Sequence, residues 1–359
     1  AMVDYRHNFS DIGWNSGGTY RLDILMRRSD DGGRTWSPIN TVVEGRKDFG
    51  YGDPSVVADR DSAGLILMQA VSGNVPYVHA TAKNPQHAMF FRSTDGGKTW
   101  DKGHDVAPSI YNLYRDEQPL TQEKGFFLTS GKITQSRIIK KDKYYRLYIA
   151  HPVLHVGTFV IYSDDFGKTW QVLGGAATIP GPDGDESKVE ELPDGSVLLS
   201  CRKFSSLGRR FNVFVYKNKK RAEGAWSEAK DAKALANCTR CNGDVVVVPV
   251  RRTIDGRKTW LAIQSLLQSK TRDHLGFYYR EIPRRGADLA PALADNWQRG
   301  VMIHEGTAAY STMSVFDDGT VGILYEADLD ANNTGYKILF SRLSVSQITG
   351  GAYEAMPAK

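Results

Sequence analysis

Short segments rich in apolar, aromatic and β-branched residues recur along the whole chain. Many alternate apolar with polar positions, which is the pattern of a strand with one buried face. Asp-Gly pairs, which favour tight turns, punctuate the series at 194–195, 255–256 and 318–319. The pattern predicts strands at 20–29, 87–93, 144–150, 157–163, 196–202, 211–218, 276–282 and 336–343.

Only one segment, ADLAPALADNW at 287–297, has the composition of a helix. Its prolines and its flanks limit it to a short insertion. Strands without helices between them cannot form parallel βαβ units, so the sequence predicts an all-β fold.

One eight-residue phrase occurs three times, as SDDGGRTW at 29–36, STDGGKTW at 93–100 and SDDFGKTW at 163–170. The copies begin 64 and 70 residues apart (93 − 29 and 163 − 93), a spacing typical of a repeat architecture. Each copy follows a predicted strand, which indicates a hairpin turn. In such a turn Ser and Asp accept hydrogen bonds from backbone N–H groups, Gly adopts a positive φ, and Trp buries its ring beneath the hairpin.

A fourth segment, TIDGRKTW at 253–260, carries Arg257 in place of the glycine and predicts an ordinary Asp-Gly hairpin.

Six blades of four strands would use about 15 residues for each strand and its turn, which the 359 residues nearly supply. The repeats therefore predict a six-bladed β-propeller.

Composition is that of a globular protein, with 41% hydrophobic and 24% charged residues. The longest apolar runs, at 64–71 and 245–250, have the length of a strand, so no membrane span is expected. The net charge of +5 suits an anionic ligand. Because the basic residues are scattered, nucleic acid is not an expected partner.

The three cysteines are too few for a disulfide scaffold. Cys238 and Cys241 form a CxxC pair, but no second pair or nearby His pair completes a zinc site. The pattern favours thiols packed near strand ends. No metal and no organic cofactor is implied.

The repeated phrase matches the Asp-box of sialidases, and five unrepeated segments resemble functional segments of the bacterial-type exo-alpha-sialidase family with BNR repeats, in the order the family has them. MVDYRHNFSD at 2–11 resembles a segment that implies substrate contact by Arg6 and general-acid catalysis by Asp11. FGYGDPSVVAD at 49–59 is similar to a strand whose first Asp, here Asp53, touches the substrate.

DGDESKVEELPDGSVLLSCR at 183–202 resembles the segment that supplies a glutamate and an arginine. The resemblance implies that Glu186 is the base partner of the nucleophile and that Arg202 binds the substrate carboxylate. Asp185 stands where the family pattern has Asn, a departure directly beside the glutamate.

SKTRDHLGFYYREI at 269–282 is similar to the strand of a further carboxylate-binding arginine, which would be Arg272, with Arg280 as a rival. AAYSTMSVFDDGTVGILYE at 308–326 resembles the nucleophile strand and implies that Tyr310 attacks the substrate.

These residue types suit the chemistry of a sugar that carries a carboxylate on its anomeric carbon. Guanidinium groups bind a carboxylate through paired, charge-assisted hydrogen bonds. A neutral Tyr activated by Glu can approach a carbon beside negative charge without the repulsion that a carboxylate would meet. Sialidases are known exceptions to the two-carboxylate rule of glycosidases for this reason.

Each candidate also has an ordinary interpretation. Arginines are mostly surface residues, Asp often forms turns, clustered acidic residues are usually solvated, and Tyr commonly packs in strands. The joint occurrence of five segments in the right order favours the functional interpretation for Arg6, Asp11, Asp53, Glu186, Arg202, Arg272 and Tyr310.

The family's first carboxylate-binding arginine lies in an Arg-Ile-Pro segment, and this tripeptide does not occur in the chain. We therefore expect residues 1–359 to form a single catalytic propeller domain that lacks its N-terminal strand. In the family that strand pairs with a segment like YKILFSRLSV at 336–345.

The sequence thus predicts a retaining exo-alpha-sialidase that acts on sialylated glycans, glycoproteins or glycolipids through a tyrosyl intermediate, in an extracellular or periplasmic location. The segments 71–80 and 151–156 are candidates for the pocket of the N-acetyl group. Two alternatives remain open. One is a trans-sialidase or intramolecular trans-sialidase using the same site, and the other is a non-catalytic glycan-binding propeller.

Overall fold

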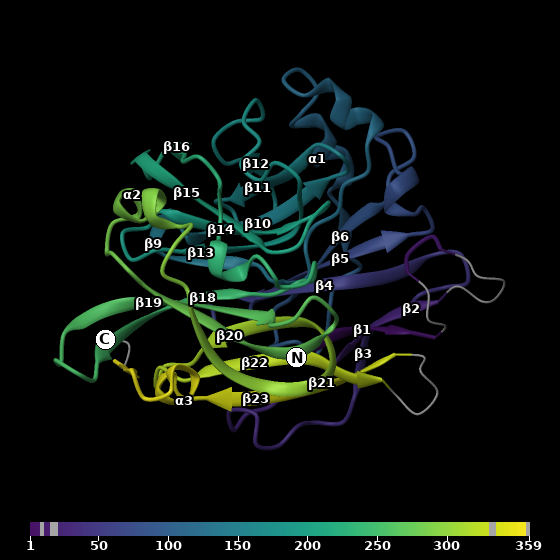
Figure 1. Cartoon of the computed structure of the whole chain (residues 1–359). Coiled ribbons are helices and arrows are strands. Elements are labelled where there is room, and N and C mark those ends of the chain that lie inside the picture. The colour runs from purple at the N-terminus through teal and green to yellow at the C-terminus, as the bar shows by residue number, and fades with distance from the viewer. Residues whose placement is uncertain (8–10, 15–20, 330–334, 357–359) are drawn as a thin grey trace. The chain divides into compact units, whose positions relative to one another are not determined.

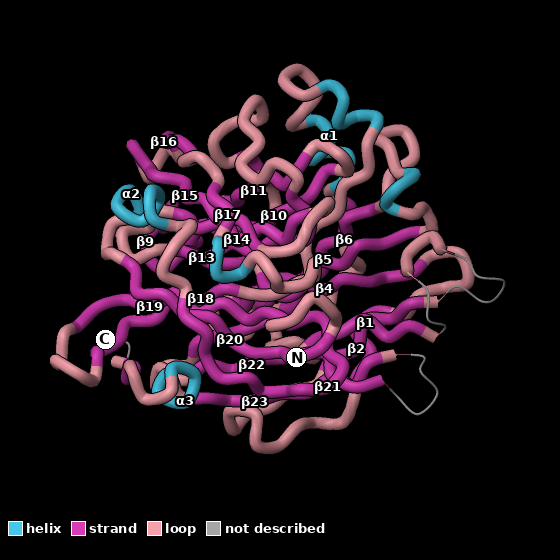
Figure 2. Tube along the Cα trace, in the orientation of Figure 1, coloured by secondary structure: helices cyan, strands magenta, loops and turns pink. Residues whose placement is uncertain are grey.

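The computed structural model describes residues 1–7, 11–14, 21–329 and 335–356. The chain divides into two compact units, Ala1–Ile179 and Pro180–Lys359, which are described separately here. Strands account for most of the regular structure in both units (Figure 2). The prediction of an all-β fold is confirmed, and the arrangement of its sheets as six blades of one propeller stays a prediction.

Three sheets occur among the described residues of the first unit (Figure 1). Neighbouring strands pair antiparallel, except for the short contact of β4 with β8. The sheets have the orders β1 (Met2–Arg6)-β2 (Leu22–Met26)-β3 (Asn40–Val43), β7 (His104–Asp105)-β6 (His87–Ser93)-β5 (Ile66–Gly73)-β4 (Gly50–Ala58)-β8 (Gly131–Lys132), and β12 (Gln171–Val172)-β11 (Gly157–Ser163)-β10 (Tyr144–Val153)-β9 (Thr134–Lys141).

The described part of the second unit has two sheets. One has the order β13 (Gly184–Glu191)-β14 (Val197–Lys203)-β15 (Arg209–Asn218)-β16 (Glu223–Trp226), with β17 (Lys230–Asp231) also beside β15. The other has the order β23 (Tyr336–Leu343)-β22 (Val321–Leu329)-β21 (Gln298–Val315)-β20 (Asp273–Ile282)-β19 (Lys258–Leu267)-β18 (Val245–Arg252)-β24 (Tyr353–Ala355). The long strand β21 pairs first with β20 and then with β22, so it belongs to both halves of this sheet.

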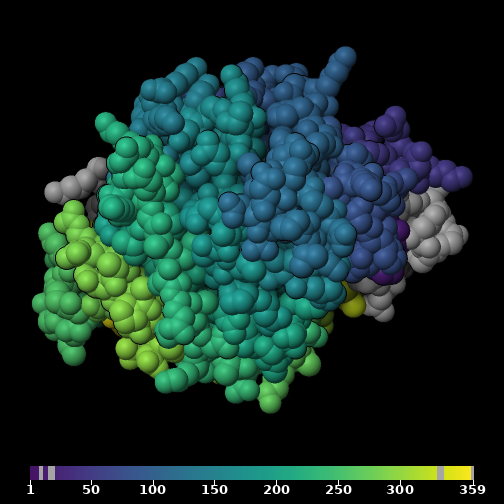
Figure 3. All heavy atoms as spheres, turned by 90° about the horizontal axis from the view of Figure 1, so that it is seen from above, coloured from purple at the N-terminus to yellow at the C-terminus, as the bar shows by residue number. Residues whose placement is uncertain are grey.

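Helical segments are few and short. The expected helix at 287–297 is present as α2 (Gly286–Leu289) and the 3-10 turn η4 (Ala290–Ala292). The expectation of a single helix was wrong, because α1 (Ala107–Asn112) and α3 (Val345–Thr349) also form. In the first unit α1 contacts β6, and the 3-10 turns η1 (Tyr77–His79) and η2 (Pro119–Glu123) also form. Figure 3 shows blue and teal residues of this unit on the face seen from above.

The helix α3 has local signals that explain it. Ser344 Oγ accepts a hydrogen bond from the backbone N–H of Gln347, and the side-chain oxygen of Gln347 accepts one from the Ser344 N–H. Gly350 ends the helix with φ of 62°. This reciprocal arrangement is a capping box, which satisfies the free N–H groups of a helix start. The S-x-x-Q spacing in the sequence could have predicted it.

The repeated phrase forms the turn that its residues predict. In the second copy the Asp95 carboxylate accepts hydrogen bonds from the Thr99 backbone at 2.9 Å and the Thr99 hydroxyl at 2.6 Å. Gly97, with φ of 86°, donates its N–H to Ser93 Oγ at 2.8 Å. The first and third copies repeat the two Asp–Thr distances.

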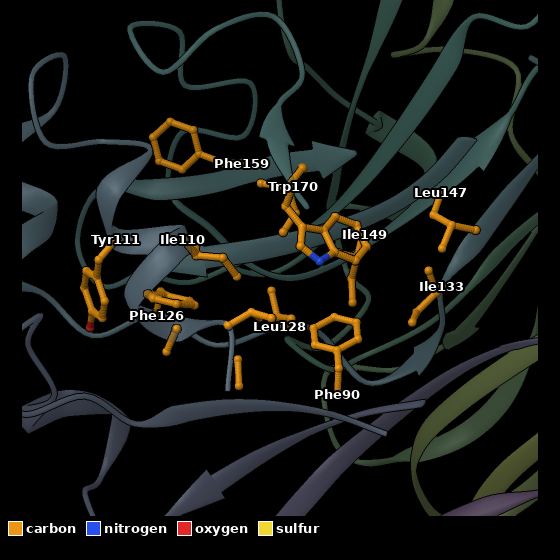
Figure 4. Packing of buried hydrophobic residues seen from close by; sticks show 14 of the residues in the cluster. Phe90, Ile110, Tyr111, Phe126, Leu128, Ile133, Leu147, Ile149, Phe159 and Trp170 are labelled. Atoms are coloured by element: carbon orange, nitrogen blue, oxygen red, sulfur yellow. The ribbon is translucent and has the colours of Figure 1, made fainter. Parts of the chain in front are cut away.

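The third copy links its turn to the core of the first unit (Figure 4). Trp170, which ends the phrase, is 6% exposed and lies 5.4 Å from Phe90 between ring centroids. Phe166 replaces a glycine of the other copies and adopts φ of 58°, a conformation that L-residues rarely take. Its ring is fully buried and stacks on Tyr144, and this packing offsets the backbone strain.

The fourth, variant segment is the ordinary hairpin that was expected. Residues 253–257 connect β18 to β19, and Gly256 supplies the positive φ of 70°. Arg252 pairs with the Asp255 carboxylate across this turn.

Candidate active site

Register breaks mark the strands that carry candidate residues. The pairing of β4 with β5 shifts around Asp53, and that of β13 with β14 shifts around Asp185 and Glu186. The pairing of β21 with β22 shifts around Tyr310. A β-bulge of this kind redirects side chains and is common beside active sites. Regular pairing resumes in each case at a buried serine, namely Ser55, Ser187 and Ser311.

In the second unit, Arg202 brings together the candidate nucleophile and its candidate base. Arg202 Nη1 donates to the Tyr310 hydroxyl at 3.3 Å. The same nitrogen pairs with Glu186 Oε2. Arg202 and Glu186 lie on the neighbouring strands β14 and β13, whereas Tyr310 comes from β21 in the other sheet. The Arg202 side chain is only 17% exposed. One guanidinium nitrogen is therefore shared by a phenol and a carboxylate.

A second carboxylate flanks the same guanidinium. Asp185 Oδ2 lies 3.2 Å from Arg202 Nε. Burial raises the pKa of Asp185 to about 6, Arg202 opposes this shift, and the neighbouring Glu186 charge adds to it. Burial alone would lower the pKa of Arg202, but Glu186, Tyr310 and Asp185 together raise it well above its usual range.

Arg272 contributes a further positive charge beside Tyr310. Its guanidinium carbon lies 5.7 Å from the centre of the Tyr310 ring, within the range of a cation–π contact. Arg272 also interacts with Tyr336 through a side-chain hydrogen bond. Its side chain is solvent-exposed, so a ligand carboxylate can reach it.

The rival Arg280 has a different environment. Arg280 is 5% exposed, and its Nη1 donates to the backbone carbonyls of Ala292 and Asp295. These bonds anchor the segment around η4 to β20. Of the two arginines, the structure places Arg272 beside Tyr310 and gives Arg280 a packing role.

Two acidic residues hold the backbone of β21, the strand of the candidate nucleophile Tyr310, and sequence reasoning missed both. Glu326 Oε2 accepts the Tyr310 N–H at 3.1 Å. Asp244, fully buried, accepts the Met313 N–H at 2.8 Å and the Thr312 hydroxyl at 3.0 Å. Glu326 lies within the segment that resembles the nucleophile strand, whereas Asp244 carries no motif.

In the first unit, Arg6 lies among three acidic residues. Arg6 Nε donates to Asp4 at 2.9 Å, and Arg6 Nη2 lies 3.8 Å from Asp11 Oδ1. Asp4, Asp11 and Asp53 raise the pKa of Arg6 above its usual range, with Asp4 the largest cause, against the effect of burial. Arg6 therefore interacts electrostatically with both Asp11 and Asp53. Asp4 belongs to the same cluster, although sequence reasoning did not identify it.

Asp11 and Asp53 also interact with nearby backbone and side-chain groups. Asp11 is exposed, accepts the Ile12 N–H through its side chain at 2.8 Å and accepts the Trp14 N–H through its carbonyl at 3.0 Å. Asp53 has φ of 49°, and its carbonyl accepts a bond from Gln69 Nε2 at 2.8 Å. A positive φ before proline is unfavourable for Asp, and such strain is concentrated at functional positions.

The two candidate segments for the N-acetyl pocket differ in accessibility. In 151–156, His151 is fully buried and bonded to the Tyr114 hydroxyl at 2.5 Å, and burial lowers its pKa to about 3. The segment 71–80 exposes Val78 at 42% and holds Tyr77 edge-on against Phe127. Accessible apolar surface therefore favours 71–80.

Cys201, Cys238 and Cys241 are all free and buried. Cys201 lies within β14, and Cys238 and Cys241 lie between η3 (Lys233–Leu235) and β18. Among the residues that the structure describes, no group of three His, Cys, Asp or Glu side chains is placed to hold a metal ion. Within the same residues, no helix has the length and apolar character needed to cross a membrane.

The all-β fold, the repeated turns and the Tyr310–Arg202–Glu186 cluster can be compared with those of known proteins, and sequence comparison assigns the chain to a family. The chain belongs to the BNR repeat-like domain family, whose model matches residues 11–323. It is similar to a sialidase of Micromonospora viridifaciens, with 28% identity over 84% of this chain and 44% of the relative. A sialidase of Bacteroides fragilis is 22% identical over 86% of this chain and 54% of the relative. The chain therefore spans about half the length of these two relatives, and the resemblance to sialidases with BNR repeats is confirmed.

Solved structures show the same fold. The intramolecular trans-sialidase from Ruminococcus gnavus, solved with oseltamivir carboxylate, superposes with a TM-score of 0.71 over 97% of this chain and 92% of its own, at 15% identity. The leech intramolecular trans-sialidase gives a TM-score of 0.72 over 98% of this chain and 67% of its own, also at 15% identity.

Proposed function

We propose that this chain is the catalytic domain of an exo-alpha-sialidase that removes terminal sialic acid from glycoconjugates with retention of configuration. The observation that carries the proposal is the convergence of Tyr310 and Glu186 on one nitrogen of Arg202. A phenol beside a buried carboxylate is an activated nucleophile, and the adjacent guanidinium suits an anionic substrate.

In the first step, Tyr310 attacks the anomeric carbon while the glycosidic C–O bond breaks. Glu186 takes the phenol proton, and Asp11 gives its proton to the leaving oxygen. Water then attacks the anomeric carbon of the sialyl-enzyme, and Asp11 takes a proton from the water. The bond between tyrosine and sugar breaks, and Glu186 returns its proton to the phenolate.

The substrate carboxylate would be held by Arg202 and Arg272. Both lie beside Tyr310, the first through its hydroxyl and the second over its ring. Arg6 and Asp53 would bind the substituents of the sugar ring. The positive charge of the two arginines compensates the charge of the substrate where the nucleophile must approach.

We further propose that the chain forms one six-bladed propeller domain, acting outside the cytoplasm on sialylated glycans. Among the residues that the structure describes, β23 is the last strand in the order of its sheet, so a strand bearing a further carboxylate-binding arginine could pair along it. Such a strand would add a third carboxylate ligand to Arg202 and Arg272.

The test measures hydrolysis of a fluorogenic sialoside, and NMR identifies which anomer of sialic acid is released first. Release of the alpha anomer supports retention, and release of the beta anomer contradicts it. A 2,3-difluoro sialic acid analogue should label the protein at Tyr310, which peptide mass spectrometry locates. Binding of sialosides without any turnover would instead indicate a glycan-binding domain, and sialyl transfer to an added lactose acceptor would indicate a trans-sialidase.

A further inference from the structure

Arg202 is placed between two buried carboxylates that belong to adjacent residues. Asp185 is 8% exposed and lies against Nε at 3.2 Å, while Glu186 is 5% exposed and pairs with Nη1. The register break in β13 allows both neighbours to face the same guanidinium, because regular pairing would direct successive side chains to opposite faces.

This arrangement creates a conflict with ligand binding. When both carboxylates are ionised, the three side chains carry a net charge of −1 (one positive charge and two negative ones). The positive charge of Arg202 is then outweighed by the two carboxylates, so a ligand carboxylate that approaches it is not attracted. Protonation of one of the two carboxylates would remove this excess negative charge.

Asp185 is the member of the pair that fits this role. Glu186 shares Arg202 Nη1 with the Tyr310 hydroxyl and is committed to the nucleophile. Asp185 lies at Nε, on the side of the guanidinium away from that contact, and its pKa of about 6 is within reach of neutral pH. The charged groups around it are Glu186 on β13, Arg202 on β14 and Arg209 on β15.

We propose that Asp185 is a positioning residue that makes binding of the substrate carboxylate depend on uptake of a proton. The inference rests on the proposed function, because it assigns the substrate carboxylate to Arg202. Protonated Asp185 leaves the charge of Arg202 available to the ligand, and ionised Asp185 competes for it. A bound anion, in turn, raises the proton affinity of Asp185.

The experiment uses the unhydrolysable 2,3-didehydro analogue of sialic acid, whose carboxylate stays ionised from pH 5 to pH 8. Calorimetry in two buffers of different ionisation enthalpy measures both the Kd and the number of protons taken up. For wild type we expect the Kd to rise about tenfold from pH 5 to pH 8, the effect of a shift of about one pKa unit on binding. Proton uptake should accompany binding near pH 7.

The variants Asp185→Asn and Asp185→Ser should bind the analogue with a Kd that changes less than about twofold over the same range, without proton uptake. Asp255→Asn is the matched control, because Asp255 pairs with Arg252 at the β18–β19 turn, and it should behave as wild type. The methyl ester of the analogue, which has no charge, should lose the pH dependence with wild type as well.

Two results would overturn the inference separately. Binding by wild type without proton uptake, or a pH slope retained in Asp185→Asn, contradicts the role of Asp185 and leaves the sialidase function intact. Absence of both analogue binding and sialoside hydrolysis by wild type would contradict the proposed function itself. The wild-type uptake measurement needs no variant, so it decides the matter even if a substitution prevents folding.

Discussion

The Tyr310 hydroxyl accepts a hydrogen bond from Arg202 Nη1 at 3.3 Å, which joins a phenol on β21 to a guanidinium on β14. The two residues are 108 positions apart in the sequence. Their contact places a positive charge at the phenol oxygen, where it would favour loss of the proton and would also attract an anionic ligand.

The first prediction concerns Tyr310, the proposed nucleophile. Tyr310→Phe keeps the ring beneath Arg272 but removes the hydroxyl, so hydrolysis of a fluorogenic sialoside should fall at least about a hundredfold, while analogue binding changes little. Steady-state kinetics and calorimetry measure the two effects. Tyr216→Phe, on β15, is the control and should retain activity. Unchanged hydrolysis by Tyr310→Phe would refute the assignment.

The second prediction separates the roles of Arg272 and Arg280, the two rival arginines of the segment at 269–282. Arg272→Lys should raise KM about tenfold or more without lowering the free energy of unfolding, because Lys loses the paired geometry that binds a carboxylate. Arg280→Lys should destabilise the fold, because the carbonyls of Ala292 and Asp295 lose their buried donor. KM and urea unfolding measured on both variants test this. The reverse pattern would make Arg280 the substrate ligand.

A third prediction addresses the buried support of the nucleophile strand. Asp244→Ala leaves the donors of Met313, Thr312 and Val245 without their carboxylate partner, which should cost about 2–4 kcal/mol of stability in urea unfolding. Asp244→Asn keeps an acceptor oxygen and should cost less. We also expect Asp244→Ala to lower kcat through displacement of Tyr310. Equal stability of both variants and wild type would show that the carboxylate does not hold the strand.

The fourth prediction is a pH dependence of the repeated turn. The Thr99 hydroxyl is the largest cause of the lowered pKa of Asp95. Because the folded pKa lies below the unfolded value of 3.8, this stabilisation is fully present above that value and disappears as pH falls through the folded pKa. Thr99→Val should therefore lower the Tm by more at pH 6 than at pH 2, which lies closer to the folded pKa of Asp95.

The matched control for this turn is Thr253→Val in the variant hairpin. The Thr253 hydroxyl donates to the carbonyls of Gly351 and Ala352, which do not titrate. Its effect on the Tm should be the same at both pH values. A pH-independent loss for Thr99→Val would mean that the carboxylate of Asp95 does not support the turn.

Local sequence patterns predicted the strands and turns well, since these depend on neighbouring residues. The predicted strands at 87–93, 157–163 and 336–343 coincide with β6, β11 and β23. The helix α1 was missed because its six residues carry a proline and gain their stability from burial of Ile110 and Tyr111 in the core. No local pattern reports that burial.

In the candidate site, too, some features were predicted from the sequence and others are visible only in the structure. Family motifs pointed to Tyr310, Glu186 and Arg202, but not to their mutual geometry or to the second carboxylate on the guanidinium. Only the structure separates Arg272 from Arg280, which lie eight residues apart in the sequence. One is exposed over the Tyr310 ring, and the other is buried against backbone carbonyls.

By itself the sequence determined the all-β class, the repeated turns and the residues that resemble a sialidase site, because these follow from short-range periodicity and from motifs. The tertiary structure decided which charges meet. Strand pairing and register breaks bring Asp185, Glu186 and Tyr310 to Arg202 from distant positions. Interactions between charges depend on distance and burial, and neither quantity is written in the order of the residues.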